Sequence, residues 1–180
     1  MTARLIALYG IIGGLIVGVP MIWQMLTLKG GESPPGMLVG YLTMIVALTT
    51  VFLGIKQYRD KVLGGVIRFG PALLVGLGIS AVASLFYVIA WEISLAWSSG
   101  FDFLEFYTKY LVDGARARGA TEAEVQQAIE EAKSFAKLYA NPLFRMPITF
   151  IEIFPVGVLI SLISAAVLRN SRVLPARAMN

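Results

Sequence analysis

The sequence contains no cysteine and no histidine. Without cysteine there are no disulfides, no thiolate chemistry and no cysteine-based metal sites. Without histidine the chain lacks the commonest metal ligand and the side chain that most often carries protons near neutral pH. These two absences remove many enzyme mechanisms, and we expect no catalytic residues, no metal and no cofactor.

Charged residues are also scarce. They make up 14% of the 180 residues, while hydrophobic residues make up 57%. A soluble domain usually carries about 25% charged residues, and the mean hydropathy here is +0.76. The basic residues that give the net charge of +4 sit at the edges of apolar runs, not in a patch with interleaved aromatics. We therefore expect a protein whose solvent is the lipid bilayer, with no nucleic-acid partner.

Four long apolar runs dominate the chain, at about 5–28, 37–55, 71–97 and 148–168, and none contains Lys or Arg. Each is near the ~20 residues that a helix needs to span the hydrocarbon core, and only helices satisfy every backbone group within one segment. Arg4 before the first run could indicate a secretory signal, but the run is long and has no small-residue cleavage site, so we expect an uncleaved helix. The sequence predicts an all-α integral membrane fold, one domain over 1–180 with four transmembrane helices.

The segment 98–146 separates the third and fourth runs, and its apolar residues recur at helical spacing. Gly119 is expected to end a first amphipathic helix, Thr121 and Glu124 form a predicted capping box for a second, and Asn141-Pro142 should end it. We expect an external helical hairpin. Its apolar stripes should pack on each other and on the membrane surface, as amphipathic helices beside spans commonly do; the alternative is a dedicated partner-binding site.

Basic residues predict the orientation of the chain. Four of them follow the second run, opposed only by Asp60, and an acid-free basic tail follows the fourth, whereas charges in 98–146 are balanced. The positive-inside rule then places both termini and the middle loop in the cytoplasm. The middle-loop cations are expected to contact anionic lipid headgroups, or alternatively a cytoplasmic protein: Lys56, Arg59, Lys61 and Arg68.

Small residues recur at helical spacing in every run. Such stripes let helix backbones approach closely in a bilayer, where packing rather than the hydrophobic effect drives association. We expect most of them to pack the four helices together, and consider the first run, whose glycines cover more than one face, as the best candidate for an additional homo-oligomer contact. The representative positions are Gly10, Gly14, Gly18, Gly76 and Gly157.

Two carboxylates fall inside apolar runs, Glu92 near the end of the third and Glu152 near the start of the fourth. Ionisable groups in a membrane are costly and mark functional hypotheses. Counting residues from the ends of the two runs places both carboxylates at the same depth below the outer membrane surface. Arg145 is their expected partner. We favour a structural tie that pins the external hairpin to the bundle over proton or ion handling. A pair of carboxylates could also act as general acid and base, as in glycosidases, but that chemistry needs a substrate pocket.

Pro155 follows Glu152 by three residues. Inside a helix it removes one hydrogen bond and produces a kink. The freed carbonyl could help the carboxylate to bind a cation, or the kink could serve packing alone.

The stretch 52–60 (FLGIKQYRD), followed by Gly64-Gly65 and Phe69-Gly70, resembles a bacterial inner-membrane family, domain of unknown function four-one-nine-nine. The similarity continues through 91–92 (WE), 141–143 (NPL) and 151–157 (IEIFPVG), and so covers nearly the whole chain. The resemblance implies a small four-span protein of the inner membrane with no catalytic residues.

For the function, we expect a non-enzymatic structural or regulatory membrane module that associates with copies of itself. The alternative is a small oligomeric proton- or ion-coupled transporter or channel that uses Glu92, Glu152 and Arg145. A lipid-modifying enzyme is the weakest hypothesis, because no cysteine, histidine or clustered polar motif supports it.

Overall fold

The computed structural model describes residues 2–27, 37–98 and 102–176, and within these ranges the chain forms six α-helices and no strand. In chain order they are α1 (Thr2–Thr27), α2 (Met37–Val62), α3 (Phe69–Trp97), α4 (Phe103–Ala117), α5 (Glu122–Tyr139) and α6 (Pro142–Leu168). The all-α prediction is confirmed.

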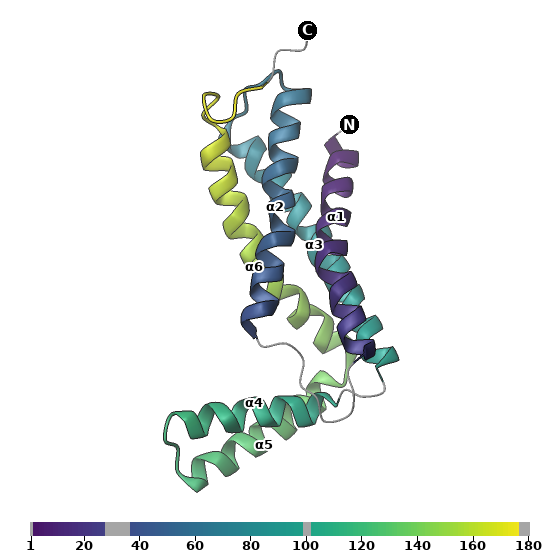
Figure 1. Cartoon of the computed structure of the whole chain (residues 1–180), viewed down its shortest axis with the longest axis vertical. Coiled ribbons are helices and arrows are strands. Elements are labelled where there is room, and N and C mark those ends of the chain that lie inside the picture. The colour runs from purple at the N-terminus through teal and green to yellow at the C-terminus, as the bar shows by residue number, and fades with distance from the viewer. Residues whose placement is uncertain (1, 28–36, 99–101, 177–180) are drawn as a thin grey trace.

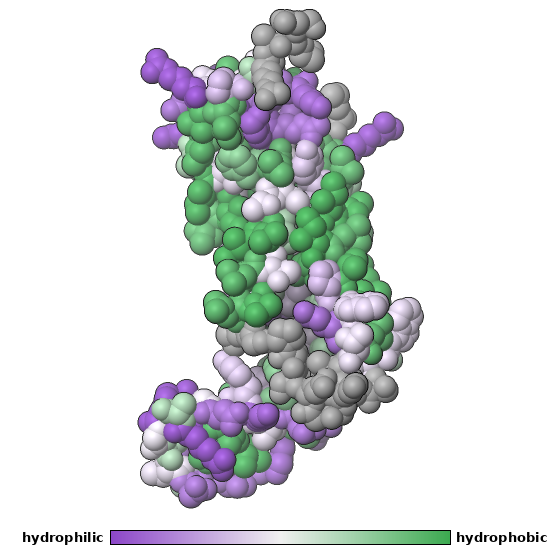
Figure 2. Space-filling model, in the orientation of Figure 1, coloured by the Kyte–Doolittle hydropathy of each residue, from purple (hydrophilic) through white to green (hydrophobic). Residues whose placement is uncertain are grey.

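Helices α1, α2, α3 and α6 form an up-and-down bundle and are each long and apolar enough to cross a membrane. Figure 1 shows both ends of the chain at the same end of the bundle, with α4 and α5 at the other. An apolar belt covers the middle of the visible face, between a hydrophilic end and the hydrophilic hairpin (Figure 2). The prediction of four spans agrees with this arrangement.

Two helices extend beyond the predicted apolar runs. Helix α2 continues to Val62, so the basic stretch after residue 55 is helical, and Gly64 and Gly65 make the turn into α3 with φ of 68° and 96°. Helix α6 begins at Pro142, where the side chain of Asn141 accepts a hydrogen bond from the Leu143 amide at 3.0 Å. A proline at the first helical position loses no hydrogen bond, because that N–H has no helical partner.

The bundle core contains a very close crossing of α3 and α6. A Cβ added to Gly76 would lie 2.8 Å from Ser161 Oγ, and one added to Gly157 would lie 2.6 Å from Ser80 Cβ. The hydroxyls of Ser80 and Ser161 lie 3.2 Å apart in the same crossing. The two glycines thus permit a contact between backbones that a larger residue would obstruct.

The glycines of α1 face α3. Added Cβ atoms would lie 2.5 Å from Val82 Cβ at Gly10, 2.3 Å from Phe86 Cβ at Gly14 and 2.9 Å from Ala90 Cβ at Gly18, and all three glycines are buried. This stripe therefore packs the bundle. In this structure it is not on a free surface, and the expected self-association stays a prediction.

Helices α4 and α5 pack against each other and extend sideways from the end of the bundle (Figure 1). Gly119 ends α4 with a φ of 76°, and the capping box at the start of α5 is confirmed. There the backbone N–H of Thr121 donates to Glu124 at 2.7 Å, and this bond, together with that of the Thr121 hydroxyl, lowers the pKa of the Glu124 carboxyl. The predicted position of this hairpin outside the membrane stays a prediction.

Pro155 lies inside α6, which continues as a helix on both sides of it. Figure 1 shows that the axis of α6 changes direction between its lower and upper halves. An interior proline is a usual cause of such a bend.

Candidate functional site

The junction between hairpin and bundle is built around the guanidinium of Arg145, which lies one turn into α6. Its Nε donates to Glu92 Oε1 of α3 at 2.7 Å, and its Nη2 donates to Glu92 Oε2. Its Nη1 donates to the backbone carbonyl of Tyr139, the last residue of α5, at 3.1 Å. Arg145 and Glu92 are 13% and 20% exposed. One side chain therefore ties together α3, α5 and α6.

Tyr139 extends this junction. Its hydroxyl accepts a hydrogen bond from Trp91 Nε1 at 2.9 Å and lies 3.4 Å from Thr149 Oγ1. Phe103 at the start of α4 stacks on its ring with 4.1 Å between centroids, and the Arg145 guanidinium lies 5.8 Å from that ring. Burial raises the pKa of Tyr139, so the phenol stays neutral and remains a hydrogen-bonding group. The ring thereby connects both hairpin helices to α3 and α6.

The sequence did not indicate the roles of Tyr139 and Thr149. Tyr139 belongs to an ordinary apolar stripe of α5, and its position just before Asn141-Pro142 was the only available signal that it lies at a corner. Thr149 donates to the backbone carbonyl of Arg145 at 3.1 Å. That bond joins residues four apart within α6, whereas the contact between the Tyr139 and Thr149 hydroxyls depends on how α5 turns into α6 and does not follow from helical periodicity.

Glu152 is not part of this junction. The antiparallel register of α3 and α6 places Arg145 beside Glu92 and Glu152 near Tyr87. Glu152 follows Arg145 by seven residues, or about 10 Å at ~1.5 Å rise per residue. The prediction that the two carboxylates share one depth is wrong. It counted from residue 148, whereas α6 begins at Pro142.

A second charged cluster lies at the opposite end of the bundle, around Arg59. Its side chain is 0% exposed. Nε donates to Asp60 at 2.7 Å, Nη1 donates to the carbonyls of Leu168 at 3.4 Å and Val173 at 2.9 Å, and Nη2 donates to that of Leu174. Leu174 has a φ of 49°, a conformation that L side chains rarely adopt.

This geometry corrects the prediction that Arg59 contacts lipid headgroups. Arg59 cannot reach a lipid surface because its donors are occupied by Asp60 and by the chain that follows α6. The other three cations differ from it: Lys56 is half-buried and binds Asp60 at 2.5 Å, while Lys61 and Arg68 are exposed. Lys61 and Arg68 therefore retain the exposure that a headgroup contact requires.

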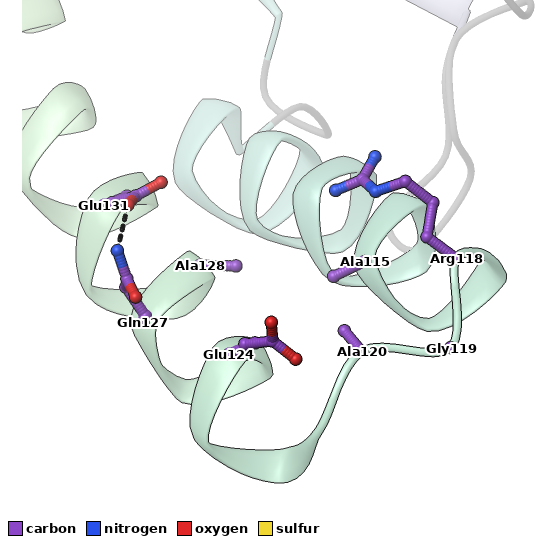
Figure 3. A pocket seen from close by; sticks show the side chains of 8 residues that line it. All are labelled: Ala115, Arg118, Gly119, Ala120, Glu124, Gln127, Ala128 and Glu131. Carbon is purple, nitrogen blue, oxygen red and sulfur yellow. Dashed lines mark hydrogen bonds between the residues drawn. The ribbon is translucent and has the colours of Figure 1, made fainter.

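A cleft of about 340 Å³ opens at the tip of the hairpin, between the end of α4 and the first turns of α5 (Figure 3). Its carboxylates are already engaged. Glu124 accepts the capping hydrogen bonds of Thr121, and Glu131 accepts one from the Gln127 amide at 2.9 Å. These bonds serve the hairpin itself.

The model of a family described as proteins of unknown function (DUF4199) matches residues 8–170. The chain belongs to this family. The match extends from α1 to just past the end of α6, so the Glu92–Arg145 junction, Glu152, Arg59 and Asp60 lie within it, whereas the carbonyls of Val173 and Leu174 that Arg59 binds lie just beyond it. No curated protein and no solved structure matches the chain.

Proposed function

We propose that this protein is a non-enzymatic structural or regulatory membrane module, whose bundle anchors the hairpin α4–α5 at one face of the bilayer. The observation that carries the proposal is the bidentate bond between Arg145 and Glu92, with the third donor of Arg145 on the carbonyl of Tyr139. Bidentate arginine–carboxylate pairs fix geometry as well as adding energy. This pair would hold the hairpin in a defined direction relative to α3 and α6.

The composition supports a non-enzymatic role. The chain has no cysteine and no histidine, and among the described residues no group of three or more acidic side chains could hold a metal ion. The partners we propose are the lipid bilayer, a second copy of the chain and an envelope protein that contacts the hairpin.

The proposed location is the bacterial inner membrane, with both termini in the cytoplasm. The exposed cations Lys61 and Arg68 lie at the end of the bundle that carries both termini, and the cytoplasmic side is the one that positive residues favour. The hairpin would then lie on the periplasmic side.

A small proton- or ion-coupled transporter is the second candidate, and Glu152 is the observation that favours it. Glu92 and Arg145 neutralise each other, whereas no cation pairs with Glu152 within the described ranges. Four spans offer little room for a pathway inside one chain, so this alternative requires an oligomer.

Flux measurements separate the two candidates. The purified protein is reconstituted in liposomes that contain a pH-sensitive dye, and proton, sodium and potassium gradients are imposed in turn. The module predicts dissipation no faster than in empty liposomes, for the wild type and for Glu152→Gln. A flux that the wild type supports and Glu152→Gln abolishes would replace the module with the transporter.

A further inference from the structure

Helix α4 carries a row of alternating charges on the side that faces away from α5. Four exposed residues, spaced four, four and three positions apart, form this charged row: Glu105, Lys109, Asp113 and Arg116. Residues at such spacing share one face of a helix. The opposite face of α4 packs on the hairpin, since the rings of Phe103 and Tyr107 both contact that of Phe135 in α5.

The charges of this row have no partner within residues 2–27, 37–98 and 102–176. Their spacing would allow ion pairs along α4, yet none of the four residues takes part in an ion pair, and none donates or accepts a side-chain hydrogen bond. Among the helices, α4 packs only against α5. The charged row is therefore an open surface.

The position of α4 places this surface next to the bilayer. Along the long axis of the molecule, most of α4 lies closer to the bundle than α5 does (Figure 1). Hydrophilic residues also line the edge of the hairpin that faces the bundle (Figure 2). At this end of the spans Trp23 and Trp97 are 71% and 68% exposed, and exposed tryptophans are typical of the membrane–water interface. The charged row thus faces the layer of lipid headgroups.

The charge balance indicates which headgroups this surface suits. Residues 102–139 contain seven acidic and five basic residues, which gives the hairpin a net charge of −2. The charged row itself has two of each sign and is neutral. Anionic lipids attract clusters of basic residues, and neither the hairpin nor the row has an excess of them. A row of alternating sign is instead complementary to headgroups that carry both a phosphate and an ammonium group.

We propose that the charged row of α4 binds the headgroups of zwitterionic phospholipids whose ammonium group is a primary amine. Lys109 and Arg116 donate to the phosphate, and Glu105 and Asp113 accept from the ammonium group. A primary ammonium offers N–H donors for charge-assisted hydrogen bonds, whereas a quaternary one has none. The inference rests on the proposed function, which places the hairpin at one face of the bilayer, and it names the lipid that the hairpin contacts there.

Carbodiimide cross-linking tests the contact directly. The full chain is placed in nanodiscs of phosphatidylethanolamine, and a water-soluble carbodiimide activates its carboxylates. The lipid amine then attacks the activated carbon, so that an amide forms and a urea leaves. Mass spectrometry locates the adducts. The intrinsic reactivity of each carboxylate is measured with soluble ethanolamine in nanodiscs of phosphatidylcholine, which has no reactive amine, and the lipid yields are divided by it.

Lipid adducts should gather on the charged row. After this correction Glu105 and Asp113 should carry about fivefold more lipid than Glu122, an exposed carboxylate in the first turn of α5. The preference is modest because ion pairs between exposed groups are weak. Equal corrected yields at the three carboxylates would overturn the proposal. Cross-links between the rows of two chains, in place of lipid adducts, would assign the surface to a second copy and would overturn it as well.

A variant that keeps both carboxylates tests the role of the phosphate. Lys109→Gln combined with Arg116→Gln should lower the adduct yield on the charged row about fivefold, because the headgroup loses its anchor. Lys133→Gln combined with Lys137→Gln makes the same change of charge on α5 and should leave that yield unchanged. An equal effect of the two variants would mean that net charge, and not the row, determines the yield, which would contradict the proposal.

The cross-linking and flux experiments fail separately. Absent lipid adducts together with absent flux would remove the headgroup contact and leave the membrane module in place. Adducts on the charged row in a protein that carries a flux dependent on Glu152 would replace the module with the transporter and leave the headgroup contact in place.

Discussion

At the scale of single residues, two arginines connect parts of the chain that are distant in sequence. Arg145 links α6 to the end of α5 and to Glu92 of α3. Arg59 links α2 to carbonyls at the end of α6 and beyond it. Arginine suits both places because its planar group offers several donors in fixed directions. Each arginine thus fixes one end of the bundle.

Replacement of Arg59 tests its role at the end that carries the termini. Arg59→Met keeps the length and apolar body of the side chain but leaves the carbonyls of Val173 and Leu174 without their donor. We expect a loss of about 3 kcal/mol in the free energy of unfolding, since breaking a buried pair costs ~3–5 kcal/mol and Asp60 keeps Lys56. Limited proteolysis should also cut the segment after α6 sooner.

The matched control for that variant is Lys61→Met, because Lys61 is an exposed cation on the same helix. Surface substitutions usually change stability by less than ~0.5 kcal/mol. If Arg59→Met were as stable as Lys61→Met, Arg59 would not be the tie that its contacts indicate.

At the scale of helices, the sequence predicted the elements well and their ends less well. Hydropathy located all four long helices, and local capping chemistry located the start of α5 at Thr121. Hydropathy did not show that α6 begins at Pro142, because the first six residues of α6 include Arg145 and two prolines, which interrupt the apolar run. The depth of Glu152 was misplaced for the same reason.

The crossing of α3 and α6 gives a direct test at this scale. Gly157→Ala introduces a Cβ only 2.6 Å from that of Ser80, so the two helices must separate. We expect a cost of about 1–3 kcal/mol, as for other overpacked cores, measured by unfolding in mixed detergent micelles. In contrast, a Cβ at Gly40 of α2 meets nothing within 4 Å, and Gly40→Ala should be neutral or slightly stabilising because alanine favours a helix. Equal costs would mean that the crossing is looser than described.

At the scale of the whole molecule, the charged segments lie at the two ends of the bundle. The N-terminus, the turn after α2 and the chain after α6 lie together, and the hairpin lies at the opposite end (Figure 1). The sequence predicted this separation from loop charge and the number of spans. It could not predict which charges are exposed, since Arg59 and Lys61 look alike in a list of basic residues but one is buried and the other is not.

Thiol labelling checks this arrangement in a membrane. The chain has no cysteine, so Lys61→Cys, Arg172→Cys and Gln127→Cys each carry one thiol. In intact spheroplasts a membrane-impermeant maleimide should label only Gln127→Cys, on the hairpin, and in inverted vesicles it should label the other two. Labelling of all three from one side would exclude the proposed topology.

The central claim is that Glu92 and Arg145 form a structural tie, and a double-mutant cycle of Glu92→Gln, Arg145→Met and the combined variant tests it most directly. The measurement is the free energy of unfolding in detergent, with hydrogen exchange at residues 139–145 as a local readout. We predict that each single change costs about 3 kcal/mol, that the combined variant costs less than the sum by about 1–3 kcal/mol, and that exchange accelerates at the junction. Single changes without effect on stability or exchange would contradict the tie and would mean that the membrane charges serve another purpose.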